Sequence, residues 1–196
     1  MVVKTSQMLK LGSLAPDFTL KNAIDGKEVS LSDFSDKKAL LVMFICNHCP
    51  YVIHVRSQFK PLAEKYLPKG VGFVAINSNS IETHPQDGPE SMKKIANELE
   101  WSDLFPFLYD ETQEVAKKYR AACTPDFYVF NSERKLVYRG QMDNARPGNN
   151  EKVTGSDLRR ALDAVLENKS IPEEDQKPSM GCNIKWHPDQ EPEYFQ

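Results

Sequence analysis

The sequence has few cysteines and no long apolar run, and each shortage excludes a class of protein. Four cysteines among 196 residues are too few for a disulfide-stabilised scaffold. The longest unbroken apolar stretch, residues 39–46, is far shorter than the roughly 20 residues that span a bilayer. The first residues also lack the apolar segment of a secretory signal, so we expect a cytoplasmic protein with no membrane partner.

Basic residues are not in excess either. The chain has 25 Lys and Arg against 28 Asp and Glu, a net charge of −3, so we expect no nucleic-acid partner. Its 40% hydrophobic and 27% charged residues are ordinary for a globular protein, and 196 residues are enough to bury a core. We expect one domain over residues 11–168. The apolar periodicity is lost after Asn168, so residues 169–196 are expected to form a C-terminal tail.

Alternating strand and helix patterns predict an α/β fold with a central mixed sheet flanked by helices. Residues 39–45 are apolar at every position, which is typical of a central strand covered on both faces. Residues 12–31 predict an N-terminal β-hairpin arm. Further strands are predicted at residues 71–77, 107–109, 127–131 and 136–139, and helices at residues 51–67, from Pro89 onward, 111–119 and 154–168. Pro61 should kink the first helix.

The sharpest motif is Cys46-Asn47-His48-Cys49-Pro50, between the central strand and the first helix. A helix N-terminus or a nearby imidazolium lowers a cysteine pKa and produces the reactive thiolate. Pro50 suits the first helical position, and His48 is placed to favour the thiolate further. Two cysteines separated by two residues can also close a small disulfide, so this pair can cycle between dithiol and disulfide.

Other interpretations of the pair stay open. Cys46 can be a core residue with Cys49 as a passive helix cap. A thiol-based copper or zinc carrier using Cys46, Cys49 and either His48 or His54 is chemically reasonable, because thiolates are soft ligands. A structural zinc site normally needs a second cysteine pair, which the sequence lacks, so no metal or other cofactor is assigned.

The strand, the CNHC pair at the helix start, the later Thr124-Pro125 and the hairpin and helix after it resemble the thioredoxin-like fold. The opening GSLAPDFTL resembles the redoxin branch, the alkyl hydroperoxide reductase and thiol-specific antioxidant family. The resemblance implies that Cys46 attacks and Cys49 resolves. It further implies that Pro125 is a cis-proline packed against the pair, with the Thr124 backbone receiving the substrate chain.

The resemblance implies a thiol-disulfide oxidoreductase, with a thiol-dependent peroxidase as the alternative. Peroxiredoxins place a Thr three residues before a peroxidatic cysteine that is followed by Pro; Cys49-Pro50 matches that ending, and Cys46 stands where the Thr would be. Either Cys49 or Cys46 would then be peroxidatic. Peroxiredoxins also use an arginine near the Thr-Pro segment, for which Arg120 and Arg139 are the nearest candidates. Thioredoxins bury a carboxylate in the strand before the pair, whereas here that strand is entirely apolar.

Two further cysteines are candidate accessory thiols. Cys123, beside Pro125, is either close enough to the pair for a mixed disulfide or a buried inert thiol. Cys182, in the tail, could resolve a sulfenic acid on Cys49, or the apolar residues around it could simply dock the tail on the core. The expected substrates are protein or small-molecule disulfides or hydroperoxides, with a thioredoxin or a low-molecular-weight thiol as electron donor.

Overall fold

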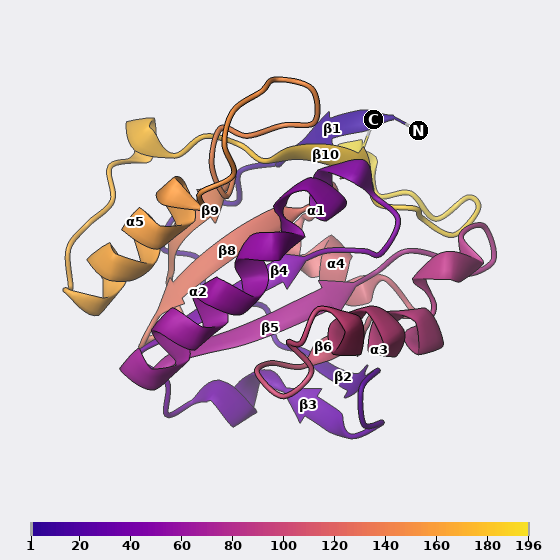
Figure 1. Cartoon of the computed structure of the whole chain (residues 1–196), viewed down its shortest axis with the longest axis horizontal. Helices are drawn as coiled ribbons and strands as arrows, with labels where there is room; N and C mark the ends of the chain where they lie inside the picture. Colours follow the sequence, from indigo (N-terminus) through magenta and orange to yellow (C-terminus); the bar gives the residue numbers. More distant parts are fainter. Residues whose placement is uncertain (1, 196) are drawn as a thin grey trace.

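A seven-stranded mixed sheet forms the centre of the molecule in the computed structural model, which describes residues 2–195 (Figure 1). Its strands β4, β5 and β6 are parallel, and the other pairings are antiparallel. The expected α/β class with a mixed sheet is therefore confirmed. In spatial order the strands are β3 (Glu28–Ser30), β2 (Thr19–Asn22), β6 (Phe107–Tyr109), β5 (Val71–Asn77), β4 (Ala39–Phe44), β8 (Asp126–Asn131) and β9 (Leu136–Gly140).

Helices cover both faces of this sheet, as the continuous apolar run in β4 predicts. Leu41 and Met43 of β4 face one core, whereas Leu40 and Val42 face the other. In Figure 1 most of the helices lie in front of the sheet, where the first core is, and α4 (Glu114–Tyr119) lies behind the sheet and contributes to the second core. The front helices are α1 (Pro50–Val55), α2 (Phe59–Tyr66), α3 (Pro89–Glu98) and α5 (Ser156–Leu166).

The predicted first helix is divided into two. A 3-10 turn at Arg56–Gln58 separates α1 from α2. Pro61 has no N–H to bond the carbonyl of Ser57, and its ring crowds that carbonyl, so the α-helical pattern is interrupted one turn before the proline. The other 3-10 turns are Leu31–Phe34, Leu67–Lys69, Pro85–Asp87, Glu173–Asp175 and Glu193–Phe195.

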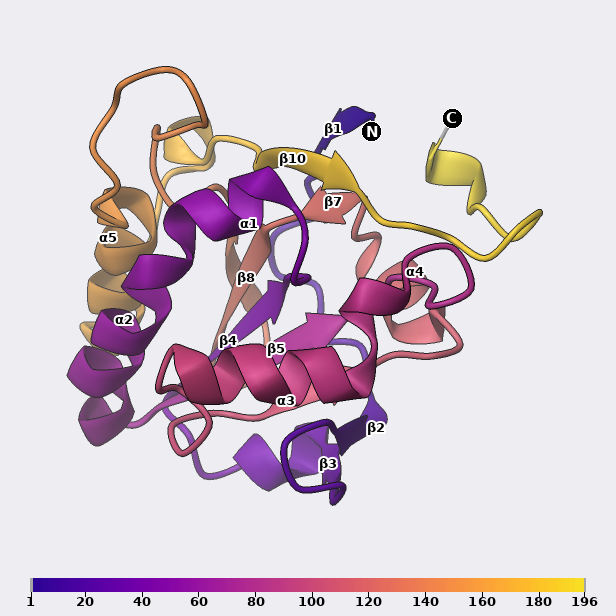
Figure 2. The same cartoon turned by 45° about the vertical axis from the view of Figure 1, so that its right-hand side comes forward.

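The N-terminal hairpin joins the main sheet, because β2 pairs with β6 as well as with β3. Ahead of it, β1 (Val3–Thr5) belongs to a second, three-stranded sheet that the sequence does not predict. In that sheet β10 (Met180–Asn183) lies between β1 and β7 (Cys123–Thr124), as Figure 2 shows. A segment near the N-terminus thus pairs with one from the C-terminal tail, and the tail strand β10 contacts α1.

Two glycines allow the backbone of the C-terminal segment to pack directly against the backbone of the domain. A Cβ on Gly181 would lie 1.9 Å from the carbonyl oxygen of Thr124, and one on Gly140 would lie 2.0 Å from that of Lys177. Only glycine fits where two backbones come this close. Beyond β10, Ile184 and Trp186 are buried in the second core. Across residues 2–195, no helix combines the length and the apolarity required to cross a bilayer.

Candidate active site

The Cys46–Cys49 motif lies at the carboxyl end of β4, in the middle of the sheet. Cys49 is the N-cap residue of α1 with an extended backbone, and Pro50 occupies the first turn. The backbone amide of Val52, in the first turn of α1, favours the negative charge on the Cys49 sulfur and lowers the pKa of Cys49. The local sequence therefore places the second cysteine where orphan helix amides stabilise a negative charge.

Cys46 is 2% exposed and faces the segment that contains Thr124. Its Sγ lies 3.4 Å from Thr124 Oγ1 and 3.9 Å from His48 Nδ1. A hydrogen bond with Cys49, burial and the negative charge of Asp87 together raise the pKa of Cys46 well above its ordinary value. In the resting dithiol, Cys46 is thus a protonated thiol.

His48 is held by a carboxylate that the sequence pattern does not single out. Asp87, in the 3-10 turn within the 78–88 loop, lies 2.5 Å from His48 Nδ1 and accepts a hydrogen bond from the backbone amide of Asn47 at 2.9 Å. Burial opposes the Asp87 charge, but hydrogen bonds from His48, Asn79 and Asn47 outweigh it and lower the Asp87 pKa. The ring of His84 stacks on that of His48 at 4.9 Å between centroids.

Cys49 has a third thiol as its nearest sulfur neighbour. Its Sγ lies 2.7 Å from Cys182 Sγ, and both residues are buried. Hydrogen bonds from Cys182 and then Cys46, together with backbone amides, outweigh burial and lower the pKa of Cys49 well below the ordinary range. The hydrogen bond to Cys49 and burial raise the pKa of Cys182. A single negative charge in this cluster therefore belongs on the central sulfur, Cys49.

The Thr124-Pro125 segment packs against both cysteines of the pair. The peptide bond before Pro125 is cis, as the family resemblance implies. Cys46 contacts the hydroxyl of Thr124, and Cys49 Sγ lies 3.1 Å from the Thr124 carbonyl oxygen, which accepts the Cys49 proton when that thiol is protonated. Thr124 is also the direct β-ladder partner of Cys182 in β10. This chain's own tail therefore lies along the backbone edge that the resemblance gives to the substrate.

Cys123 is buried on β7 and is directed differently from the other thiols. Its thiol donates a long hydrogen bond of 3.9 Å to the Pro125 carbonyl oxygen. Burial and the neighbouring Asp126 raise its pKa well above the ordinary value. These surroundings are those of a structural thiol rather than a reactive one.

A buried carboxylate lies beside the site, on a different strand from the one where thioredoxins carry theirs. Asp126 is the first residue of β8 and pairs with Phe44 at the end of β4. It accepts hydrogen bonds from Ser6 Oγ at 2.6 Å and from the Tyr128 hydroxyl at 2.9 Å. Burial outweighs these hydrogen bonds and raises the pKa of Asp126 to about 7.

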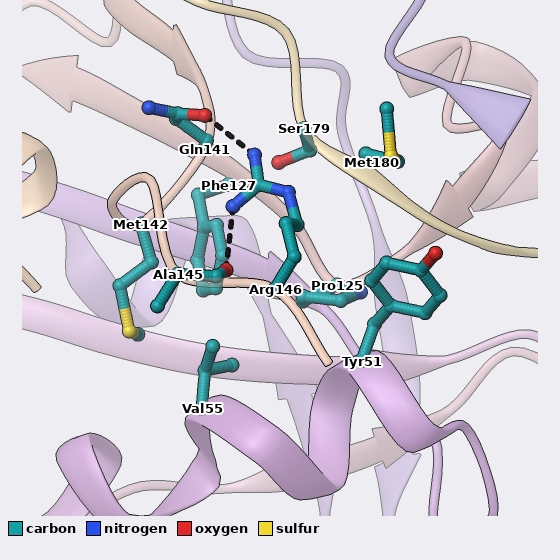
Figure 3. Close-up of a pocket in the computed structure, with 10 residues that line it drawn as sticks. All are labelled: Tyr51, Val55, Pro125, Phe127, Gln141, Met142, Ala145, Arg146, Ser179 and Met180. Carbon is teal, nitrogen blue, oxygen red and sulfur yellow. Dashed lines mark hydrogen bonds between the residues drawn. The ribbon is translucent and has the colours of Figure 1, made fainter. Parts of the chain in front are cut away.

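Neither arginine suggested by the sequence is engaged at the thiols. Arg120 lies over the ring of Tyr194, and Arg139 is buried against Gln176 and Glu173. A third arginine, Arg146, lines a hollow beside Pro125, between α1, the 141–146 loop and β10 (Figure 3). Its guanidinium points toward Gln141 and donates to the carbonyl oxygens of Asp143 and Ala145, both at 2.7 Å, so it holds that loop in place.

One group of side chains in the described part of the chain could hold a metal ion. Ligand atoms of Cys46, His48 and Asp87 lie within 4.8 Å of one another. Cys49, which the carrier hypothesis includes, faces Cys182 instead. The buried Nε2 of His54 has no hydrogen-bond partner among residues 2–195 and is not part of the group.

Comparisons with known proteins agree with this geometry. A family model described as Redoxin matches residues 10–158. An uncharacterized conserved protein from Geobacillus kaustophilus is 57% identical over 96% of this chain and 98% of that chain, with a TM-score of 0.92. The thioredoxin domain of a thiol-disulfide oxidoreductase from Bacteroides vulgatus, 22% identical over 68% of this chain and 89% of its own, has a TM-score of 0.57 and shows the fold. A protein named "Putative peroxiredoxin bcp" from Helicobacter pylori is 29% identical over 115 residues, 59% of this chain and 68% of its own. The expected thioredoxin-like fold is confirmed.

Proposed function

Because the chain belongs to the Redoxin family, we propose that it is a thiol-disulfide oxidoreductase in which Cys46 and Cys49 cycle between dithiol and disulfide. The sequence-based expectation of a thiol oxidoreductase is confirmed at the level of the family and its relatives. The roles of individual residues are our proposal. The observation that carries it is the packing of both sulfurs against Thr124, directly before Pro125.

Cys46 is the attacking sulfur in this proposal. It is followed by Asn47 and His48, which are both partly exposed, whereas Cys49 is enclosed by Cys182 and Thr124. The Cys46 thiol transfers its proton to the neighbouring Cys49 thiolate, and the Cys46 thiolate attacks the substrate disulfide, whose S–S bond breaks and releases one substrate sulfur as a thiolate. Cys49 gives its proton to that released sulfur and then attacks Cys46 in the mixed disulfide. The second substrate sulfur leaves and takes a proton from water, and a Cys46–Cys49 disulfide remains.

The test compares disulfide reduction by the wild type, Cys46→Ser and Cys123→Ser with dithiothreitol as reductant. Insulin and hydroxyethyl disulfide serve as a protein substrate and a small substrate. We expect Cys46→Ser to fall to the uncatalysed rate, while Cys123→Ser, which removes a buried thiol directed at Pro125, retains activity. Equal rates for the wild type and Cys46→Ser with both substrates would reject the assignment.

A thiol-dependent peroxidase is the second candidate, and the lowered pKa of Cys49 favours it. A peroxidatic cysteine reacts as the thiolate, and Cys49 is followed by Pro50 at a helix start. The similarity to a relative named as a peroxiredoxin supports the same candidate. Stopped-flow consumption of hydrogen peroxide by the reduced chain tests it; a rate constant no greater than that of free cysteine would exclude it.

Relatives of these two kinds support disulfides or hydroperoxides as substrates and thiols as reductants. The identity of the reductant, a thioredoxin or a low-molecular-weight thiol, stays a prediction, as does the cytoplasmic location. Turnover with each reductant in place of dithiothreitol would identify the donor, and cell fractionation would test the location.

A further inference from the structure

The third thiol of the site comes from a segment more than 130 positions along the chain from the motif. Cys182 Sγ is 2.7 Å from Cys49 Sγ, although the two residues are 133 positions apart in the sequence. A disulfide bond is about 2.05 Å long, so a small movement would join these two atoms. Strand β10 packs against α1, so Cys182 lies beside the same helix start as Cys49.

Strand pairing fixes this arrangement independently of the side chains. Cys182 is directly opposite Thr124 in the antiparallel β10–β7 ladder, and on its other side it pairs with Val3 of β1. Gly181 allows the close approach, because a side chain there would collide with the Thr124 carbonyl. The tail therefore runs along Thr124 as the substrate chain is expected to, and it brings a thiol to the pair.

We propose that Cys182 is a third redox thiol, which exchanges with the Cys46–Cys49 disulfide to form a Cys49–Cys182 disulfide and release Cys46. The Cys182 sulfur attacks Cys49 and forms the new S–S bond. The Cys46–Cys49 bond breaks with its electron pair on Cys46, which takes up the proton that Cys182 loses. The protein contains one disulfide before the step and one after it, so the step needs no external oxidant or reductant.

This inference rests on the proposed function, because the starting disulfide is the product of the Cys46 and Cys49 cycle. It adds that the oxidised protein stores its disulfide inside the fold while Cys46 returns to the thiol state beside His48. Cys182 is 1% exposed, which does not hinder an attack from within the protein.

Peptide mapping of the full chain distinguishes the two disulfides. Trypsin places Cys46 and Cys49 in one peptide, residues 39–56, Cys182 in residues 170–185 and Cys123 in residues 121–134. The reduced chain is oxidised with diamide, quenched in acid, alkylated, digested and analysed by mass spectrometry. We expect peptide 39–56 linked to peptide 170–185 through Cys49, with Cys46 alkylated, alongside the internally bridged peptide 39–56.

Each outcome has one meaning. If only the internally bridged peptide forms, the role of Cys182 is refuted and the proposed function stands. If Cys49 enters no disulfide, both are refuted. The Cys46→Ser variant isolates the second pair, and we expect it to form the link between Cys49 and Cys182 on oxidation; failure to do so would also overturn the inference. A link of peptide 121–134 to Cys49 in place of Cys182 would count against it as well.

A backbone variant tests the position of Cys182 without removing a thiol. In Gly181→Ala the methyl group cannot fit beside the Thr124 carbonyl, so β10 must move away from β7. We expect the Cys49–Cys182 link to fall about tenfold as the effective concentration of Cys182 drops, with the internal bridge of peptide 39–56 still formed. Met180→Ala, which truncates an exposed side chain of the same strand, is the matched control and should retain the link. An unchanged link in Gly181→Ala would refute the positional argument.

Discussion

Replacing Asp126 with Asn should change how the stability of the protein depends on pH. Asp126 is completely buried beside the site. Its carboxylate accepts hydrogen bonds from Ser6, at the end of the N-terminal segment, and from Tyr128 on its own strand. These bonds do not compensate for the loss of hydration, so burial raises its pKa from 3.8 to about 7.

The size and sign of the effect follow from linkage between protonation and folding. Below about pH 3 the carboxyl group is protonated in both the folded and the unfolded chain, and it has no effect on the pH dependence of stability. As the pH rises to about 7, the unfolded chain loses this proton while the folded chain keeps it, so the free energy of unfolding decreases by about 1.4 kcal/mol per pH unit. The decrease levels off above the folded pKa, after a total of about 4 kcal/mol.

Urea unfolding of the reduced wild type and of Asp126→Asn between about pH 4 and pH 8 measures this effect. We expect the stability of the variant relative to the wild type to increase by about 4 kcal/mol over that range, since every other titrating group contributes equally to both proteins. Asp103→Asn, at an exposed carboxylate, is the control and should show no such trend. A difference between Asp126→Asn and the wild type that is constant with pH would refute the reasoning.

Two further predictions concern the carboxylate at the motif and the glycine that admits the tail. Asp87→Asn removes a negative charge that raises the Cys46 pKa, so alkylation of Cys46 by iodoacetamide should become severalfold faster at neutral pH, with its pH profile shifted to lower pH; an unchanged or upward-shifted profile would contradict this. Gly140→Ala should destabilise the protein by roughly 2–3 kcal/mol in urea unfolding, because its Cβ would collide with the Lys177 carbonyl. Gly148→Ala has a positive φ but open space around the new methyl group, so it should cost only about 1 kcal/mol, and equal losses in the two variants would exclude the collision as the cause.

The parts of the fold that the sequence predicts are those whose signal is local. The strands β4 and β5 are apolar except for Asn77 at the end of β5, and their bounds agree with the prediction to within a residue. The position of the cysteine pair between a buried strand and a helix is likewise visible in consecutive residues. The kink expected from Pro61 is present as the turn at Arg56–Gln58.

The parts that the sequence does not predict depend on contacts between distant segments. Strands β1 and β10 have only three and four residues, too few for a detectable alternation, and they are strands because they pair with each other and with β7. Asp87 lies in a polar loop without periodicity, and only the fold brings it to His48. In the sequence Asp126 resembles any polar residue at a strand end. Its pKa is raised because it is buried, and the residues that help to cover it, Ser6 and Ser179, come from the two distant ends of the sequence.

The position of β10 also bears on which substrates the site can take. A polypeptide that approached Thr124 through backbone hydrogen bonds would have to displace Cys182 and its neighbours from β7. That displacement also breaks the pairing of β10 with β1, because the three strands form one sheet. A small disulfide or a hydroperoxide needs no backbone edge and can reach Cys46 past the partly exposed His48. Small substrates should therefore react with the closed form, and protein substrates only after the tail has been released, so Gly181→Ala should increase the rate with insulin more than the rate with hydroxyethyl disulfide. An equal change in the two rates would show that the tail does not restrict access.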